Sequence, residues 1–281
     1  MKVFLNGKLV PEEEAVVSIF DRGFLYGDGL FETIRIHNGK PFRWTQHLAR
    51  LRRGAEFLRL KVPISCSELL LRAVELVAAN QLSDALLRIT LSRGVGIRGY
   101  SPKGAGQPTL VMATHRAPAL SEEALQRWRL VISSMRVPAG EPLAAFKTCN
   151  KLPQILARAE AESRGADEAL LLNTKGELAE AASSNLFWIE GEAICTTPLT
   201  SGILAGIMRE LIFELGASMR IHVQEKAAQP DTLRGASGVF LTLSSLGIVE
   251  ATELEGRSLA TSTLVEHIFA SYRQTVMEET A

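Results

Sequence analysis

The stretch LAAFKTCNKL at residues 143–152 places Lys147 directly after an apolar run, at the edge of a segment that we expect to be buried. Burial disfavours the ammonium form of a lysine, so a lysine in this setting is poised to lose its proton. A neutral lysine amine can form a Schiff base with a carbonyl group. Lys151 is the competing candidate, although its place at the start of the next predicted helix favours exposure.

A second stretch, GELAEAASSNLF at residues 176–187, places Glu180 shortly before a predicted strand. A carboxylate close to a Schiff-base lysine can hold a ring nitrogen of a bound cofactor in its protonated form. Lys147 and Glu180 are therefore a candidate pair for one cofactor site. In isolation, a solvated lysine is an equally plausible interpretation.

Composition and charge exclude several classes of protein. The chain has 281 residues, of which 46% are hydrophobic and 22% charged, so it can bury a core in one large domain or two ordinary ones. Its formal net charge of +0 argues against a nucleic-acid-binding surface. Three cysteines without metal-ligand spacing fit a reducing cytoplasm, and we expect no metal site. We also expect no signal peptide and no membrane span.

The first part of the chain predicts a unit of strands and two helices. Asn-Gly pairs at residues 6–7 and 38–39 are strong hairpin signals. Strands are predicted at residues 2–5, 8–10, 31–36, 41–42, 85–92 and 108–114, and apolar residues at helical spacing predict helices over 44–58 and 69–77. We predict an N-terminal domain at 1–116 and a linker at 117–121.

The second part, residues 122–281, predicts a larger domain. Strands are expected at residues 128–135, 169–173, 185–189, 193–196, 219–224 and 238–243. Helices are expected at 153–163, with a proline in the first turn, at 204–215, and along 264–276. The predicted fold class is therefore α/β (α+β).

The glycine-rich loop at residues 94–99, GVGIRG, matches the GxGxxG pattern of dinucleotide-binding folds. Such a site also needs a helix to begin at the loop, and the following YSPKG cannot begin one cleanly. The loop instead presents Arg98 and Tyr100 on a glycine frame that suits a substrate carboxylate. On these residues alone, a plain turn with a solvated arginine is the simpler interpretation.

Residues 202–209, GILAGIMR, run from a loop into a helix with two glycines close to its start. The free N–H groups and the dipole of such a helix start can bind phosphate, and Thr242, Ser244 and Ser245 at the end of a strand could add hydroxyl donors. Arg50 lies on the face of its helix opposite the apolar stripe, which by itself indicates a surface arginine. His47, one turn earlier, is more typical of a capping or packing residue.

In this order and spacing, the segments resemble the fold-type IV pyridoxal phosphate enzymes, the class IV aminotransferases, from Asp21 to about Val249. Further matching pieces are DRG at 21–23, YGDGLFE at 26–32 and HLARL at 47–51. The resemblance implies a smaller N-terminal α/β domain and a larger, β-barrel-like C-terminal domain with helices. It also implies pyridoxal 5′-phosphate as cofactor and a homodimer with active sites near the subunit interface.

The resemblance assigns roles residue by residue. Lys147 would be the Schiff-base lysine and proton shuttle, and Glu180 would pair with the pyridinium nitrogen. The phosphate would be bound by Arg50, by the N–H groups of Ile207 and Met208, and by the Ser244 hydroxyl. The substrate, an anionic amine or amino acid, would be contacted by Phe31, Thr33, Arg98, Tyr100 and Ser245.

Within the family, RGVGIRGY at residues 93–100 resembles the 4-amino-4-deoxychorismate lyases of folate biosynthesis. The KxxNKL pattern at 147–152 also resembles these lyases, and D-amino acid transaminases are similar there. These enzymes form 4-aminobenzoate and pyruvate. Leu243 and Glu250 depart from the lyase pattern. The alternatives are a transaminase of D-amino acids or branched-chain amino acids, where Leu152 counts against the branched-chain group, and a non-catalytic cofactor-binding paralogue.

Overall fold

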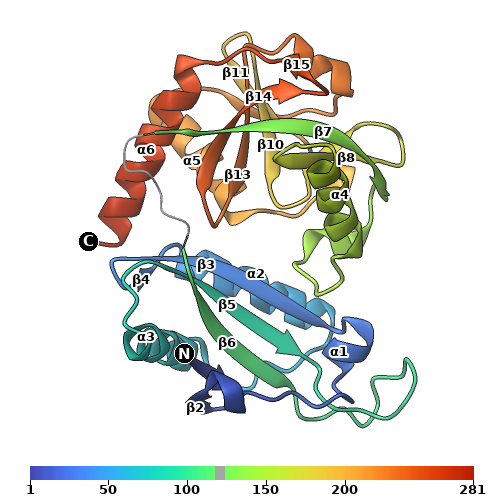
Figure 1. Cartoon of the computed structure of the whole chain (residues 1–281), viewed down its shortest axis with the longest axis vertical. Coiled ribbons are helices and arrows are strands. Elements are labelled where there is room, and N and C mark those ends of the chain that lie inside the picture. Colours follow the sequence, from blue (N-terminus) through green and yellow to red (C-terminus); the bar gives the residue numbers. More distant parts are fainter. Residues whose placement is uncertain (118–123) are drawn as a thin grey trace. The chain divides into compact units, whose positions relative to one another are not determined.

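The computed structural model describes residues 1–117 and 124–281 and shows a mixed α/β fold, which confirms the predicted fold class (Figure 1). The chain forms two compact units. The first comprises residues 1–117, 146–150 and 276–281, and the second comprises 124–145 and 151–275. Residues 118–121 of the predicted linker lie outside the described residues. Within the described part of the chain, no helix has the length and apolar character needed to cross a membrane.

The first unit is built on a six-stranded antiparallel sheet in the order β2-β1-β6-β5-β3-β4. Its strands are β1 (Lys2–Leu5), β2 (Lys8–Pro11), β3 (Gly29–His37), β4 (Lys40–Pro41), β5 (Ala85–Ser92) and β6 (Thr109–Arg116). Both predicted hairpins are present. Asn6 and Asn38 have φ of 47° and 50° and are each followed by a glycine with positive φ, as two-residue hairpin turns require.

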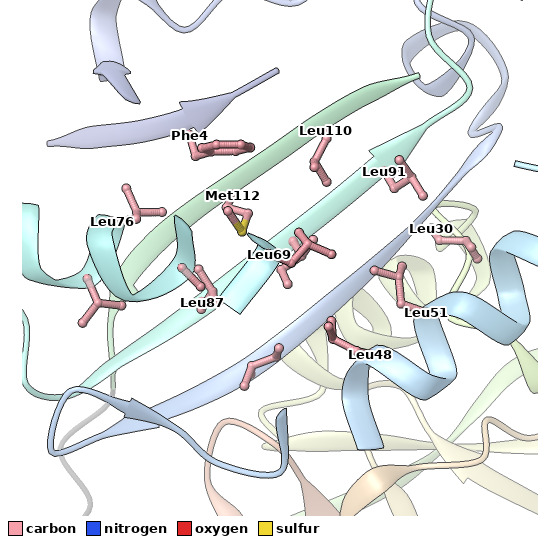
Figure 2. Packing of buried hydrophobic residues seen from close by; sticks show 14 of the residues in the cluster. Phe4, Leu30, Leu48, Leu51, Leu69, Leu76, Leu87, Leu91, Leu110 and Met112 are labelled. Atoms are coloured by element: carbon pink, nitrogen blue, oxygen red, sulfur yellow. The ribbon is translucent and has the colours of Figure 1, made fainter. Parts of the chain in front are cut away.

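The helices of this unit are α1 (Arg22–Tyr26), α2 (Trp44–Phe57) and α3 (Cys66–Ala79). The Ser65 hydroxyl accepts a hydrogen bond from the Glu68 N–H and caps the start of α3. The buried apolar residues of α2 and α3 pack with alternate residues of the sheet in one apolar cluster. Figure 2 shows members of this cluster, with Leu48 and Leu51 on α2 and Leu87 on β5. One face of the sheet is therefore the core, and the other is left for side chains such as Phe31.

The second unit contains a nine-stranded mixed sheet in the order β12-β11-β10-β13-β14-β7-β8-β9, with β15 paired to β14. Its strands are β7 (Gln126–Val137), β8 (Glu168–Asn173), β9 (Leu178–Ala181), β10 (Asn185–Glu190), β11 (Ala193–Thr196), β12 (Val223–Glu225), β13 (Gly238–Leu243), β14 (Gly247–Leu254) and β15 (Arg257–Ser258). Parallel pairs join β7 to β8, β7 to β14 and β11 to β12. The sheet curls into a half-barrel, in line with the expected β-barrel-like domain.

The remaining helices are α4 (Leu152–Ser163), α5 (Ile207–Met219) and α6 (Thr263–Glu279). Short 3₁₀ turns lie at η1 (Glu12–Glu14), η2 (Pro142–Ala145), η3 (Leu199–Ser201) and η4 (Pro230–Arg234). The predicted start of α5 at residue 204 is wrong, because Gly206 has an extended ψ of 139°. The strand predicted at 219–224 is shorter, since Met219 ends α5 and Arg220 turns the chain with φ of 58°. Elements α1, β9, β14 and β15 were not predicted.

We expect Leu76→Ala to lower the free energy of unfolding by about 2–5 kcal/mol, because it leaves a cavity in the packed cluster. Leu76 is 0% exposed, whereas Leu71 on the same helix is 54% exposed. Urea unfolding of both alanine variants is the measurement, and Leu71→Ala is the control, with a change of less than about 0.5 kcal/mol. Equal losses in the two variants would contradict this account of the core.

Candidate active site

A buried cluster of charged side chains joins β3 to α2 in the first unit. The two carboxylate oxygens of Glu32 accept hydrogen bonds from Arg50 Nε at 2.8 Å and Nη2 at 2.6 Å. His47 Nδ1 lies 2.7 Å from Glu32 Oε2. Each of the three residues is at most 4% exposed. The sheet thus carries the acid and the helix carries the two bases, one turn apart.

This cluster corrects the sequence interpretation of Arg50. The arginine was expected on the solvent face of its helix, but its guanidinium is buried beside Glu32. A bidentate carboxylate pair offsets part of the cost of burying the charge. His47 is the buried packing residue that its position indicated. Glu32 was not selected from the sequence, because an acid inside an apolar strand has no periodic signature.

The cluster shifts the ionisation of two of its members. Burial alone would raise the pKa of Glu32, but the charge of Arg50 and the hydrogen bonds from Arg50 and His47 outweigh burial and lower the pKa to about 2. Burial lowers the pKa of His47, and hydrogen bonding to Glu32 only partly offsets that effect. At neutral pH, Glu32 is therefore an anion and His47 is neutral.

Lys147 is held at the free end of β3 by main-chain pairing. Its carbonyl accepts a hydrogen bond from the Phe31 N–H at 2.9 Å, and the Cys149 N–H donates to the Gly29 carbonyl at 2.9 Å. Thr148 forms an antiparallel bridge with Leu30. These bonds fix the backbone of Lys147 against the sheet of the first unit.

Lys147, Phe31 and Arg88 form a second group on the side of the sheet away from the core. Lys147 Nζ lies 4.8 Å from the centroid of the Phe31 ring, and Arg88 Cζ lies 3.9 Å from it. Thr33 lies opposite Arg88 in the β3–β5 pair, so it belongs to the same face. Burial lowers the pKa of Arg88. The structure thus places Lys147 and Arg88 beside Phe31, with Thr33 on the same face of the sheet.

Arg88 is a candidate site residue that the sequence analysis missed. In β5, Ala85, Leu87, Ile89 and Leu91 alternate with less buried residues, and Arg88 occupies one of the intervening positions. Such alternation normally sends a charged residue into solvent. A cation midway along a strand was the available signal, but the sequence could not show that Phe31 lies beside it.

Arg98 and Tyr100 lie on an exposed loop of the first unit, and Tyr100 is 88% exposed. No helix follows Gly99 in the described chain before β6, so the dinucleotide interpretation of the glycine pattern is wrong, as the YSPKG sequence indicated. Gly94 has φ of 81°, and a Cβ there would lie 1.8 Å from the Gln107 carbonyl oxygen. Glycine is therefore required at that position by the path of the loop.

In the second unit, Glu180 anchors the loop that leads into α5. Glu180 Oε2 accepts hydrogen bonds from the Leu204 N–H at 3.0 Å and from Asn185 Nδ2 at 3.4 Å. Asn185 Nδ2 also donates to the Leu204 carbonyl at 2.9 Å. A Cβ on Gly206 would lie 2.0 Å from Asn185 Oδ1, so a larger residue there would displace the Asn185 side chain. Glu180 and the helix start are thus parts of one local structure.

The start of α5 has the features of an anion site. Gly206 is the N-cap and provides no capping side chain, so the first N–H groups, including those of Ile207 and Met208, are not satisfied by a cap. Thr242 lies opposite Asn185 in the β10–β13 pair, and its buried hydroxyl has no hydrogen-bond partner among the described residues. The buried Ser184 hydroxyl likewise lacks a partner there.

Ser244 and Ser245 follow β13 and are half-buried. Together with the helix start and the hydroxyls of Thr242 and Ser184, they supply several donors, which suits an acceptor with as many oxygens as a phosphate. These residues therefore fit a phosphate-bearing cofactor. In the part of the chain that the structure describes, no group of three or more histidine, cysteine, aspartate or glutamate side chains could hold a metal ion.

Comparison with known proteins gives a consistent picture. Residues 29–254 match the model of the family described as amino-transferase class IV. The chain is 36% identical to a putative branched-chain-amino-acid aminotransferase of Methanocaldococcus jannaschii, covering 92% of this chain and 89% of the relative. It is 31% identical to a D-alanine aminotransferase of Bacillus licheniformis (100% and 99% covered) and 29% identical to an aminodeoxychorismate lyase of Bacillus subtilis (90% and 86% covered).

Solved structures agree in fold. A branched-chain aminotransferase from Thermoproteus uzoniensis with norvaline has a TM-score of 0.90 at 31% identity, covering 98% of this chain and 94% of that one. A putative 4-amino-4-deoxychorismate lyase from Legionella pneumophila has a TM-score of 0.87 at 28% identity, with 94% and 97% covered. A third structure, a branched-chain amino acid aminotransferase complexed with N-(5'-phosphopyridoxyl)-L-glutamate, has a TM-score of 0.89 at 28% identity, with 97% and 93% covered.

The low pKa of Glu32 predicts acid sensitivity. Its stabilising contribution is complete above the ordinary glutamate value of 4.5 and is lost as pH falls from there toward 2. The depressed pKa of His47 acts in the same direction, because protonating the buried imidazole favours the unfolded chain. We expect urea unfolding to show a free energy that falls by about 3 kcal/mol from Glu32 alone over this range.

Glu32→Gln should abolish that part of the pH dependence, and it should cost about 3–5 kcal/mol at neutral pH by leaving Arg50 without its counter-charge. Glu13→Gln, at an exposed position, is the control and should keep the wild-type pH dependence. An unchanged pH dependence in Glu32→Gln would show that the buried pair does not govern acid unfolding.

Proposed function

The chain belongs to the class IV aminotransferase family, whose enzymes use pyridoxal 5′-phosphate, and from this premise we propose that it is a 4-amino-4-deoxychorismate lyase. The reaction would yield 4-aminobenzoate and pyruvate, as a step in folate biosynthesis in the cytoplasm. The loop at residues 93–100 supports this choice over other members, and the KxxNKL pattern at 147–152 supports it over the branched-chain aminotransferases.

The observation that carries the proposal is that a half-buried arginine and the candidate lysine both lie against the ring of Phe31. Arg88 Cζ and Lys147 Nζ lie 3.9 Å and 4.8 Å from the Phe31 ring centroid. Aminodeoxychorismate carries two carboxylates, and a guanidinium in a partly desolvated setting binds a carboxylate strongly. Arg88 would bind one carboxylate beside the reacting amine, and Arg98 on the loop would bind the other.

Pyridoxal phosphate supplies an electron sink for the electron pair that remains when the substrate loses a proton. Lys147 would accept that proton from the amine-bearing carbon through Nζ, which its fixed backbone holds near Phe31. The bond between a ring carbon and the oxygen of the three-carbon ether side chain would then break. The departing enolate would take up the proton from Lys147 and so become pyruvate. Thr33 and Ser245 would border the substrate.

The cofactor would be bound by Lys147 and by the residues that the family resemblance assigns to its ring and its phosphate. Glu180 would hold the ring nitrogen protonated, and its bonds to Leu204 and Asn185 fix its position for that role. The phosphate would be bound by the N–H groups of Ile207 and Met208 and by Ser244, and Arg50, oriented by Glu32, would supply a positive charge. The Thr242 hydroxyl is a further donor to the same phosphate.

Transamination is the second candidate, and the relatives favour it. The identities of 36% and 31% belong to proteins named as aminotransferases, against 29% for the named lyase. Lys147 would accept the same proton but return it to a different carbon, and the product would be a keto acid. The named relatives are all enzymes, so a non-catalytic paralogue is not proposed.

The first unit also supports a homodimer. Large apolar side chains are exposed along the segment before and within α1, among them Ile19 (66%), Phe20 (62%) and Phe24 (74%). Ile97, on the loop that bridges to Asp21 through Val95, is 61% exposed. Apolar side chains gathered in this way are typical of a surface covered by a partner. A second copy of the chain is the partner expected in this family.

The proposed function predicts which products the enzyme releases. Incubation of the cofactor-loaded protein with aminodeoxychorismate should release pyruvate, whereas incubation with D-alanine or a branched-chain amino acid and 2-oxoglutarate should give little keto acid. Lys147→Ala should lower the rate at least about 10³-fold, because the proton acceptor is lost. Lys151→Ala is the matched control and should retain activity. Keto acid formed from one of the amino acids, with no pyruvate released from aminodeoxychorismate, would establish the transaminase instead.

The proposed homodimer predicts the mass of the protein in solution. We expect light scattering after gel filtration to give a dimer mass, and Phe20→Asp with Phe24→Asp to shift the protein toward the monomer by placing charges in the apolar surface. Val74→Asp, at a 44% exposed position on α3, is the control. A wild-type monomer at micromolar concentration would refute the dimer.

A further inference from the structure

Arg22 is a buried arginine whose hydrogen bonds go to one short stretch of loop. Its exposed fraction is 4%. Nη1 donates to the carbonyl oxygens of Gly99 at 2.8 Å and Ser101 at 3.1 Å, and Nη2 donates to that of Tyr100 at 3.1 Å. Three consecutive carbonyls of the glycine-rich loop are thus bound by a single guanidinium.

Arg22 is itself fixed by Asp28. Arg22 Nε donates to Asp28 Oδ2 at 2.8 Å, and Arg93 donates to the same carboxylate through Nε at 2.7 Å and Nη2 at 3.0 Å. Arg93 also donates to the carbonyls of Leu58 and Arg59 beyond the end of α2. Through Asp28 and Arg93, Arg22 is therefore connected to the chain that follows α2. Only Arg22 donates hydrogen bonds to the loop carbonyls.

Tyr26 adds a second attachment. Its hydroxyl accepts a hydrogen bond from the Gly99 N–H at 3.2 Å, and its ring lies edge to face with that of Tyr100, 5.7 Å between centroids. Arg22 Cζ lies 5.0 Å from the Tyr26 ring centroid. Gly96 leaves room for the arginine, since a Cβ there would lie 3.0 Å from Arg22 Cδ. The backbone of residues 99–101 is held from two residues of α1.

The side chains on this loop remain exposed although its backbone is fixed. Carbonyls of an exposed loop can bond to water, so a buried arginine is not needed to satisfy them. What the arrangement achieves is a single conformation for the segment that carries Arg98 and Tyr100. A loop ordered before binding avoids the entropy cost of ordering it on binding, and that saving appears as affinity.

We infer that Arg22 is a positioning residue that fixes the loop carrying Arg98 and Tyr100 and thereby sets the enzyme's affinity for the substrate carboxylate. The inference rests on the proposed function, in which this loop binds a carboxylate. Arg22 does not touch the reacting atoms, so the chemical step is independent of it.

The test compares Arg22→Gln and Arg22→Lys with the matched control Arg93→Gln. Both glutamine substitutions remove one arginine from Asp28, but only Arg22→Gln removes the bonds to the loop carbonyls. Two measurements are made on the cofactor-loaded protein. One is KM and kcat for the substrate that the wild type turns over, and the other is the rate of tryptic cleavage after Arg98 and Lys103.

For Arg22→Gln we expect KM to rise about tenfold, with kcat within about twofold of the wild type, since a loss of preorganisation weakens binding alone. Cleavage at the two loop sites should accelerate several-fold. Arg22→Lys should lie between Arg22→Gln and the wild type, because one ammonium cannot reproduce the fork of a guanidinium. Arg93→Gln should keep the wild-type KM and cleavage rate.

Wild-type KM in Arg22→Gln, with or without faster cleavage, would overturn the inference. So would an equal rise of KM in Arg93→Gln, because general destabilisation would then explain the result. Failure of the proposed function is distinguishable, since it appears in the wild type as no release of pyruvate from aminodeoxychorismate. If the wild type turns over an amino acid instead, KM is compared with that substrate. If it is inactive on every substrate, tryptic cleavage decides whether Arg22 holds the loop, and an unchanged rate refutes it.

Discussion

The bidentate pair between Glu32 and Arg50 is the interaction on which the rest of the first unit depends. It lies where β3 meets α2 and carries opposite charges in a place that water does not reach. Such a pair contributes less to stability than its short distances suggest, because both ions lose their hydration. The pair instead determines how α2 is placed along the sheet. Only one placement of α2 on the sheet lets the guanidinium meet the carboxylate, and that placement determines where Arg50 lies.

Successive side chains of β3 point to opposite faces of the sheet, and the two faces have different roles. Glu32 points into the core side with α2, while Phe31 and Thr33 point to the side that carries Lys147 and Arg88. A shift of one residue in the pairing of β3 would exchange these sets. The hydrophobic core and the candidate catalytic group are therefore specified by the same strand and the same register.

The sequence was sufficient for features that depend on local chemistry. Asn-Gly turns and helical periodicity predicted most elements, and the family motifs selected Lys147 and Phe31, which the structure places side by side. It was insufficient where a partner lies far along the chain. Arg50 appeared to be solvated because its counter-ion is 18 residues away on a strand. Arg88 was not selected because a charged residue that alternates with apolar ones in a strand normally faces solvent. The strand β14 was missed because Glu250, which the structure buries against Arg127, interrupts its apolar pattern.

The first unit is discontinuous in sequence, and this affects its synthesis on the ribosome. Residues 146–150, which carry the lysine, complete the edge of β3, and residues 276–281 also belong to this unit. An early-emerging sheet can therefore form its core before its edge is covered, but it cannot acquire its lysine until part of the second unit has been translated. A chimaera that exchanges the N-terminal unit between relatives would have to transplant residues 146–150 with it, because a simple cut near residue 117 separates the lysine from the strand that holds it.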